Sequence, residues 1–249
     1  MKKNILFLLA LCSCVLFSCQ NKKGQIVIEG KLKHANNEWI RIGMIGENDL
    51  VMLDSMKMKN GEFSFVIPAE TDEQKARAAS PMMYQIILTN DNTLTTLAKG
   101  GEHIVIEADA QNLLSTYHIH GGEECELMAQ LDSALTSFVN PTNKLFETYE
   151  KNVENDSIRN EIEQKYVVLL QKHKDYLTHF IQKHPNNMAS FIAFYQSYNR
   201  RSFFSEQGDL DLLKKITTSL QKQYPDNPYV KNMKLRVEML ELVGQEQTE

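Results

Sequence analysis

Cysteine is scarce in this chain, and its spacing excludes most of the chemistry that cysteine supports. The 249 residues hold four cysteines, and no two of them form a C-x-x-C pair. A thioredoxin-type redox site and a cysteine zinc site both depend on that spacing. The sequence therefore predicts neither a dithiol active site nor a cysteine-ligated zinc ion.

Three further absences narrow the range of functions. Lysine and arginine number 27 against 32 aspartates and glutamates, so the chain lacks the basic excess that nucleic-acid binding needs. A glycine-rich phosphate loop and a G-x-S-x-G nucleophile elbow are both missing. The longest apolar run, from Ile5 to Phe17, is shorter than the roughly 18 to 20 residues that cross a bilayer as a helix. We therefore predict no nucleic-acid partner and no membrane-spanning helix.

That apolar run instead has the features of a signal peptide. It follows two lysines and ends at "LFSC", which resembles the lipobox of bacterial lipoproteins, with Leu16, Ser18 and the acceptor Cys19 in their expected places. The resemblance implies that Cys19 receives a diacylglycerol and that the peptide bond between Ser18 and Cys19 is cut. We therefore expect a signal peptide over residues 1–18, and a lipidated cysteine with its tether over 19–23. Several acyl chains on one residue give stable membrane anchoring.

This processing leaves a single candidate for a free thiol. Cys12 and Cys14 would leave with the signal peptide and Cys19 would be acylated, so only Cys125 remains. Cys125 lies in "GGEECELMAQL", where neighbouring carboxylates disfavour a thiolate although a helix start would favour one. We interpret Cys125 as a structural or incidental cysteine.

Residues 24–121 alternate between apolar and polar side chains. "QIVIEGKLK", "EWIRIGM" and "NGEFSFVIP" show the period of two that is typical of half-buried strands. Asn60-Gly61 is a strong hairpin signal, because a two-residue primed turn needs positive φ at both positions. About eight short strands without intervening helices predict an antiparallel β-sandwich or barrel. The polar, alanine-rich stretch 69–80 is expected to form a long loop or a single helical turn.

From residue 122 to residue 244 the apolar period becomes that of a helix. Leu127, Leu131 and Leu135 are four residues apart, and a longer stripe begins after the cap at Asp156 and ends before Pro185. We expect an antiparallel bundle of four to six helices, followed by a polar tail over 245–249. The fold class is therefore α+β, with the strands first and the helices after them.

The histidines are the only candidates for a metal site, and they are weak ones. His118 and His120 in "YHIHG" would share one face of a strand and could hold a metal if His103 or Glu123 supplied a third ligand. No spacing enforces that arrangement, and solvent-facing histidines on a strand are more common. We therefore predict no metal and no other cofactor.

Four motifs together resemble a known family. They are "GQIVIEGKL", "LVMLDSMKM", "NGEFSF" and "EHIVIEAD", and they come after the lipobox. The pattern is similar to the domain-of-unknown-function 4369 family of Gram-negative lipoproteins and covers about residues 24 to 240. In that family a β-domain and a helical spacer precede a thioredoxin-like thiol-disulfide module. The resemblance implies a fold and a compartment, but no catalytic residue.

The sequence departs from the family plan at its end. It stops at "MLELVGQEQTE", near the point where the thioredoxin-like module would be expected to begin, and a W-C-x-x-C motif is missing. We therefore expect a non-enzymatic lipoprotein that binds a ligand or serves as a scaffold. The alternative is the accessory half of a periplasmic thiol-disulfide system that works with a thioredoxin-like partner or another envelope protein. "QNKK" after Cys19 lacks an acidic cluster, which favours the periplasmic face of the inner or outer membrane.

The anchor is directly testable. Replacing Cys19 with Ser removes the acyl acceptor, and each buried methylene contributes about 0.8 kcal/mol to membrane binding. The variant is therefore expected to incorporate no radiolabelled fatty acid and to leave the membrane fraction. Cys125→Ser is the matched control and should label and sediment as the wild type does. Continued membrane association of Cys19→Ser would contradict the prediction.

Overall fold

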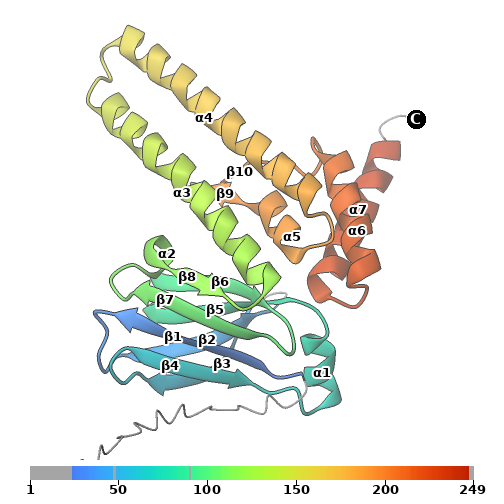
Figure 1. Ribbon diagram of the computed structural model, residues 1–249. Helices are drawn as coiled ribbons and strands as arrows, with labels where there is room; N and C mark the ends of the chain where they lie inside the picture. The colour runs from blue at the N-terminus through green and yellow to red at the C-terminus, as the bar shows by residue number, and fades with distance from the viewer. Residues whose placement is uncertain (1–23, 47–48, 90, 247–249) are drawn as a thin grey trace, which may run out of the picture.

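The computed structural model describes residues 24–46, 49–89 and 91–246 (Figure 1). The predicted signal peptide, Ser18, Cys19 and the tether lie outside the described residues, as do residues 247–249 of the predicted tail. Within the described ranges, no helix is both long enough and apolar enough to cross a membrane.

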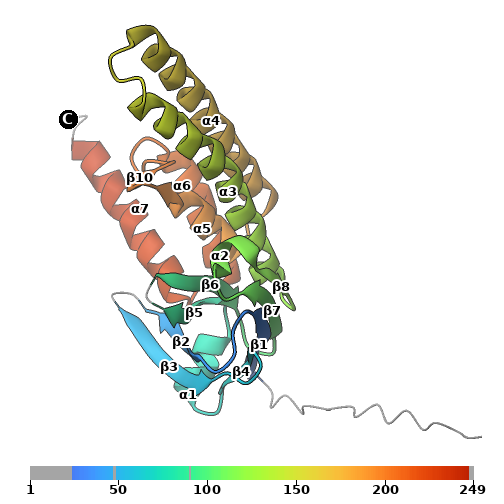
Figure 2. The ribbon, with the colours of Figure 1, turned by 90° about the vertical axis from the view of Figure 1, so that its left-hand side faces the viewer.

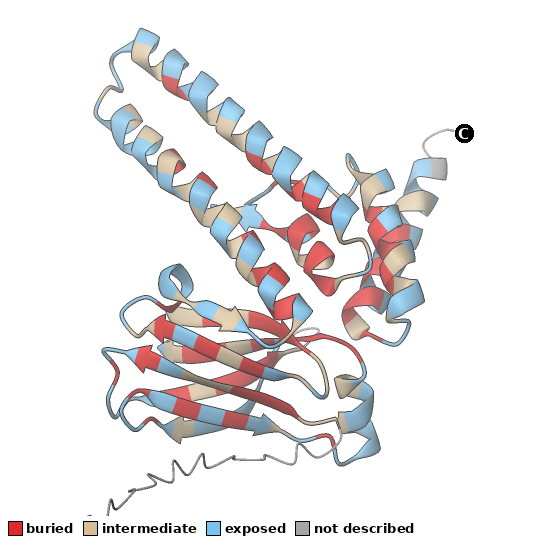
Figure 3. Cartoon of the chain, viewed as in Figure 1, coloured by how far each residue is buried: buried red, intermediate tan, exposed pale blue. Residues whose placement is uncertain are grey.

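The first half of the described chain forms two open sheets of four strands each. Their orders are β4-β1-β7-β8 and β3-β2-β5-β6. The strands are β1 (Ile26–Lys33), β2 (Trp39–Ile45), β3 (Leu50–Lys57), β4 (Glu62–Ile67), β5 (Met82–Thr89), β6 (Asn92–Ala98), β7 (His103–Asp109) and β8 (His118–His120). Buried residues alternate along them (Figure 3), as in β4, where Phe63 and Phe65 are buried and Ser64 is exposed. The alternation that the sequence predicts is confirmed there.

Of the two expected β-architectures the barrel does not form, and the expected antiparallel pairing is wrong for one pair of strands. Neither sheet closes into a barrel, and pairing is not antiparallel throughout, because β1 and β7 run parallel with Val27 opposite His103. The alternation of apolar and polar residues predicts which side chains are buried. It carries no information about which strand pairs with which, or in what direction.

The turn at Asn60-Gly61 forms as predicted, but it does not join two strands of one sheet. Both residues have positive φ, 54° and 75°, and a bridge between Lys59 and Glu62 closes the turn. A Cβ on Gly61 would lie 2.1 Å from the carbonyl oxygen of Leu32, so glycine is required by space as well as by φ. Beyond the turn, β3 and β4 part into different sheets.

Two short helices accompany the strands. The stretch expected as a loop or one turn contains α1 (Asp72–Ala78), and α2 (Leu113–Thr116) precedes β8. Thr71 and Gln74 form a capping box at the start of α1, in which each side chain accepts a backbone N–H of the other. The T-x-x-Q pattern therefore explains why a helix begins there.

The second half of the described chain contains five helices and a small hairpin. The helices are α3 (Glu123–Glu150), α4 (Asp156–Lys183), α5 (Met188–Tyr195), α6 (Leu210–Gln223) and α7 (Pro228–Glu246). The hairpin, β9 (Ser197–Tyr198) with β10 (Arg201–Ser202), was not expected from the sequence. Its turn residues Asn199 and Arg200 both have positive φ, 49° and 64°, although the pair lacks the glycine that usually signals such a turn.

The helices cover one side of the paired sheets and leave the other side open. Figures 1 and 2 show α3 and the helices after it above β5, β6 and β8, whereas β3 and β4 lie at the opposite side. Asn227, at the start of α7, donates from Nδ2 to Ser80 Oγ at 3.0 Å and to the Pro81 carbonyl oxygen at 2.9 Å. Tyr229 donates to the Ile45 carbonyl oxygen at 2.5 Å. These bonds join the helical half to the strands.

A buried carboxylate caps α5 from a different helix. The α5 cap residue, Asn187, makes no side-chain capping bond of its own. Instead, Glu124 at the start of α3 accepts from the Met188 N–H at 2.9 Å and from the Ala189 N–H at 3.0 Å. Burial raises the pKa of Glu124, and these hydrogen bonds oppose that rise in part.

We expect Glu124→Ala to lower the free energy of unfolding by about 3 kcal/mol, because it leaves two buried N–H groups without acceptors. The wild type should also lose stability as pH rises from 4.5, the ordinary glutamate pKa, through the raised folded-state value, because ionisation is disfavoured in the folded protein. Denaturant titrations across the acidic range would show this slope, which Glu124→Ala should flatten. Glu123→Ala, at an exposed neighbour, is the control and should change stability little.

Candidate ligand pocket between the two sheets

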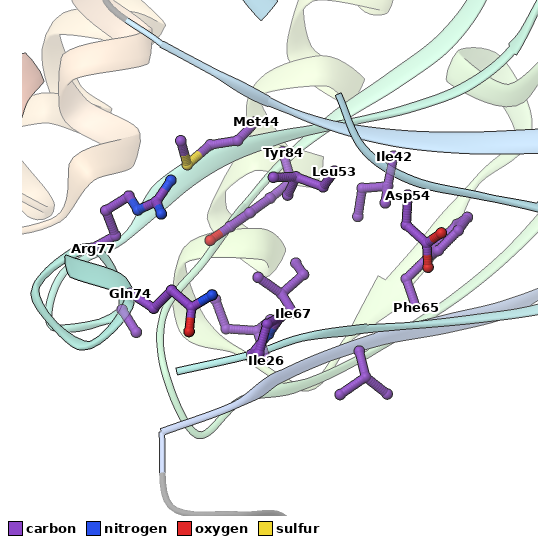
Figure 4. A pocket seen from close by; sticks show the side chains of 13 residues that line it. Ile26, Ile42, Met44, Leu53, Asp54, Phe65, Ile67, Gln74, Arg77 and Tyr84 are labelled. Atoms are coloured by element: carbon purple, nitrogen blue, oxygen red, sulfur yellow. The ribbon is translucent and has the colours of Figure 1, made fainter. Parts of the chain in front are cut away.

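A cavity of about 240 Å³ lies between the two sheets, next to α1 (Figure 4). One wall comes from β1 and β4, the other from β2, β3 and β5, and α1 supplies the residues at one end. Most of the lining is apolar. Ile26, Ile42 and Phe65 are almost fully buried, and they occupy inward positions of the alternating pattern.

The course of β3 explains why the sheets leave this space. The pairing of β2 with β3 shifts at Ile42/Gly43, which is the mark of a β-bulge, and a bulge bends and twists the strand that carries it. The side chains of β3 are exposed or half-buried along its whole length, and Leu53 remains 37% exposed. Edge strand β3 therefore does not seal the gap to edge strand β4, and the cavity forms between them.

The hydroxyl of Tyr84 reaches into the cavity from β5. Tyr84 is only 2% exposed, and no hydrogen bond joins its hydroxyl to any described residue. Tyr229 is almost as buried, yet its hydroxyl donates to the Ile45 carbonyl and accepts from the Met83 N–H at 3.3 Å. Burial raises the pKa of Tyr84, so the hydroxyl stays protonated and can donate. The hydroxyl therefore opens onto the cavity as a donor that no described residue uses.

Helix α1 brings two more polar groups to the same end. The positive charge of Arg77 opposes the rise in the pKa of Tyr84, which places the guanidinium within electrostatic reach of that hydroxyl. Arg77 also contacts Glu73 at 3.5 Å, one helical turn away, in an exposed pair of the kind that contributes little. Gln74 uses its Oε1 in the capping box, so its amide N–H₂ is left as a donor.

Asp54 is the remaining charged residue of the lining, and Figure 4 places it on the other side of the cavity from Arg77. Its Oδ1 accepts the backbone N–H of Ser55 at 2.7 Å. The cavity is therefore polarised, with positive charge and donors at the α1 end and a carboxylate beside β3. No nucleophile with an adjacent base lines it.

The predicted histidine site does not assemble. Within the described ranges, no three side chains of His, Cys, Asp or Glu are grouped so that they could hold a metal ion. His118 and His120 lie on one face of β8, as expected, and both are exposed. His103 instead contacts Glu29 at 2.9 Å. Cofactor binding by these histidines gains no support from the structure.

Cys125 lies in the core and away from the cavity lining. Its side chain is fully buried, and its Sγ donates to the Gly122 carbonyl oxygen at 3.0 Å. Burial raises the pKa of the Cys125 thiol to about 12, and the charges of Glu102 and Glu126 add to the rise. A thiol of this kind stays protonated and unreactive at neutral pH, which agrees with its interpretation as a structural cysteine.

Sequence reasoning did not single out Tyr84, Arg77 or Gln74. The capping box could have identified α1, because the T-x-x-Q pattern stands in the sequence at Thr71. Nothing in "MMYQIILT" shows that the tyrosine hydroxyl lacks a partner, since that depends on residues remote in the chain. The cavity is thus a finding of the structure.

No protein-family model, no curated protein and no solved structure matches this chain. The similarity to the 4369 family stays a prediction that rests on the sequence motifs alone.

The two buried tyrosines give a matched test of the pocket. Tyr84→Phe removes an unpartnered hydroxyl, so we expect the free energy of unfolding to stay unchanged or to rise by up to about 1 kcal/mol. Tyr229→Phe removes a hydroxyl that bonds to two backbone groups, and should lower it by about 2 kcal/mol. Denaturant titrations of both variants, without ligand, measure the difference. A loss for Tyr84→Phe as large as that for Tyr229→Phe would contradict the assignment.

Proposed function

We propose that this protein is a non-catalytic binding lipoprotein of the cell envelope. In this proposal acylated Cys19 tethers it to the periplasmic face of a membrane, and the cavity between the sheets receives a small molecule. The observation that carries the proposal is the Tyr84 hydroxyl, which belongs to a residue that is 2% exposed, reaches into a mostly apolar cavity and has no hydrogen-bond partner among the described residues.

The size and lining of the cavity support binding. An apolar cavity of about 150 Å³ is enough to take up benzene, and this one measures about 240 Å³. Binding sites for small molecules are mostly apolar, with a few polar groups that orient the ligand. Tyr84, Arg77 and Gln74 are such groups, and they converge on one end of the cavity.

The first described residues lie near the α1 end of the cavity, where a tether would join the folded protein. Gly24 lies beside Ala69, which precedes α1, and Gly101 donates to the Gln25 carbonyl oxygen at 2.8 Å. Ile26, two residues further on, lines the cavity. A tether that continues from Gly24 therefore starts near the α1 end of the cavity.

Among the described residues, the one cysteine does not support the thiol-disulfide alternative. Cys125 is buried, has its pKa raised to about 12, and lies outside the cavity lining. An accessory role in disulfide exchange would need an accessible thiol, or a surface for a thioredoxin-like partner. Because Cys125 is buried, it is not an accessible thiol.

The binding proposal is tested with 1-octanol, a neutral amphiphile. Mature protein in lipid nanodiscs, titrated by calorimetry against an empty-nanodisc blank, should show saturable binding at one site. Leu53→Trp enlarges a cavity-lining side chain on exposed β3 and should weaken that binding at least about tenfold. Met52→Trp, next to it but outside the lining, is the control and should bind as the wild type does. No saturable binding, or equal binding by Leu53→Trp, would overturn the proposal.

The buried thiol gives a separate test against the alternative. At pH 8 the native mature protein should not react with a thiol reagent, because the thiolate of Cys125 is scarcely populated. In denaturant, one thiol per chain should react, and Cys125→Ser should show none. Rapid labelling of the native protein, or a mixed disulfide on Cys125 in purified material, would restore the thiol-disulfide alternative.

A further inference from the structure

The hydrogen-bond donors of the cavity lie at one end and the Asp54 carboxylate lies at the other, so a ligand with one anionic head has a favoured orientation. Tyr84, Arg77 and Gln74 meet at the α1 end, as Figure 4 shows. Away from them the walls are mostly apolar side chains such as Ile42 and Phe65, with the carboxylate of Asp54 beside them. A matching molecule has a polar head at α1 and an apolar body between the sheets.

The head of the ligand is expected to accept hydrogen bonds, because Arg77 and the Gln74 amide are donors at this end and the Tyr84 hydroxyl can donate as well. The Tyr84 hydroxyl is protonated and lacks an acceptor among the described residues. Arg77 carries five N–H donors, and its exposed contact with Glu73 at 3.5 Å is weak enough to exchange for a better one. Arginine binds carboxylates through two parallel hydrogen bonds, and charged acceptors make the stronger bonds. The complementary head is therefore a carboxylate.

The volume of the cavity limits the length of the apolar part of the ligand. A dry cavity of about 150 Å³ takes up benzene, which has six carbon atoms. A cavity of about 240 Å³ therefore holds a chain of roughly eight carbon atoms. Longer acyl chains would extend past the gap between β3 and β4 into water.

We propose that the cavity binds a straight-chain monocarboxylate of about eight carbons, with its carboxylate on Arg77 and Tyr84 and its alkyl chain between the two sheets. This inference rests on the proposed function of the cavity as a binding site. It adds the chemical class of the ligand and the direction in which the ligand lies.

The charges of Arg77 and Asp54, on opposite sides of the cavity, also determine which related molecules should bind more weakly. A dicarboxylate of similar length would bring its second charge toward Asp54, a carboxylate on the opposite side. An alkylammonium in the same orientation would place its cation beside Arg77. Like charges at close range destabilise a complex, so a single carboxylate on an uncharged chain fits the lining best.

The experiment compares octanoate, 1-octanol and octylammonium on the same mature protein in nanodiscs, with empty nanodiscs as the blank. Octanoate should bind at least about tenfold more tightly than 1-octanol, because it adds charge-assisted hydrogen bonds. Arg77→Gln and Tyr84→Phe should each weaken octanoate binding by a larger factor than 1-octanol binding, because only the carboxylate loses a charge-assisted hydrogen bond. Circular dichroism spectra that match the wild type would show that both variants are folded. Lys75→Gln removes a positive charge from α1 outside the lining and is the matched control.

The outcomes separate the two proposals. If 1-octanol binds and octanoate binds no more tightly, the carboxylate assignment fails and the binding site stands. Tighter binding of octylammonium, or octanoate affinity unaltered in Arg77→Gln, also overturns the assignment. If none of the three molecules binds, the proposed function itself fails. Octanoate preference that is lost in Arg77→Gln and kept in Lys75→Gln supports the inference.

Discussion

The side chain of Asn227 joins the two halves of the molecule, and the geometry of the cavity depends on it. Asn227 is 1% exposed, and its amide donates to Ser80 and Pro81 while its oxygen accepts the N–H of Tyr229. Ser80 and Pro81 connect α1 to β5. The side-chain amide of Asn227 therefore caps α7 and also holds the link between α1 and β5. Arg77 lies just before this link in the sequence, and Tyr84 lies just after it. A buried amide with unmet bonds would be costly, so this junction has one favoured arrangement.

Tyr229 connects the helical half to β2 as well. Its hydroxyl is fully hydrogen-bonded, unlike that of Tyr84. The Tyr229 hydroxyl holds the carbonyl of Ile45, at the end of β2, and the N–H of Met83, the residue before Tyr84. Backbone groups at both sides of the cavity are thus satisfied by the helical half. The rule that buried polar groups are paired holds at this junction. The Tyr84 hydroxyl differs because it opens onto the cavity, where a ligand can supply the acceptor.

The sequence predicts which residues are inside, but not how the strands are joined. Phe63 and Phe65 are buried at alternate positions, and Asn60-Gly61 turns with positive φ, because both signals are local. The parallel pairing of Val27 with His103 is not local, and no alternation specifies it. The candidate site is harder still to predict. Tyr84 reads as one more residue of an apolar strand, and the sequence does not show that its hydroxyl opens onto a cavity that β1, β3, β4 and α1 help to line.

The exposed apolar edge at β3 is better explained by the cavity than by pairing with another strand. A bare edge strand invites a second strand, and proteins prevent this with bulges, inward charges and lysines. β3 carries a bulge opposite Ile42/Gly43, an inward Asp54 whose carboxylate occupies the N–H of Ser55, and Lys57 at its end. These features oppose strand addition, yet the bulge and Asp54 also border the cavity, where Leu53 forms part of the wall. The edge of β3 is thus protected against pairing with another strand, yet it leaves a gap to β4 through which a small molecule can enter. An alkyl chain in this gap would cover apolar surface that the two sheets leave exposed.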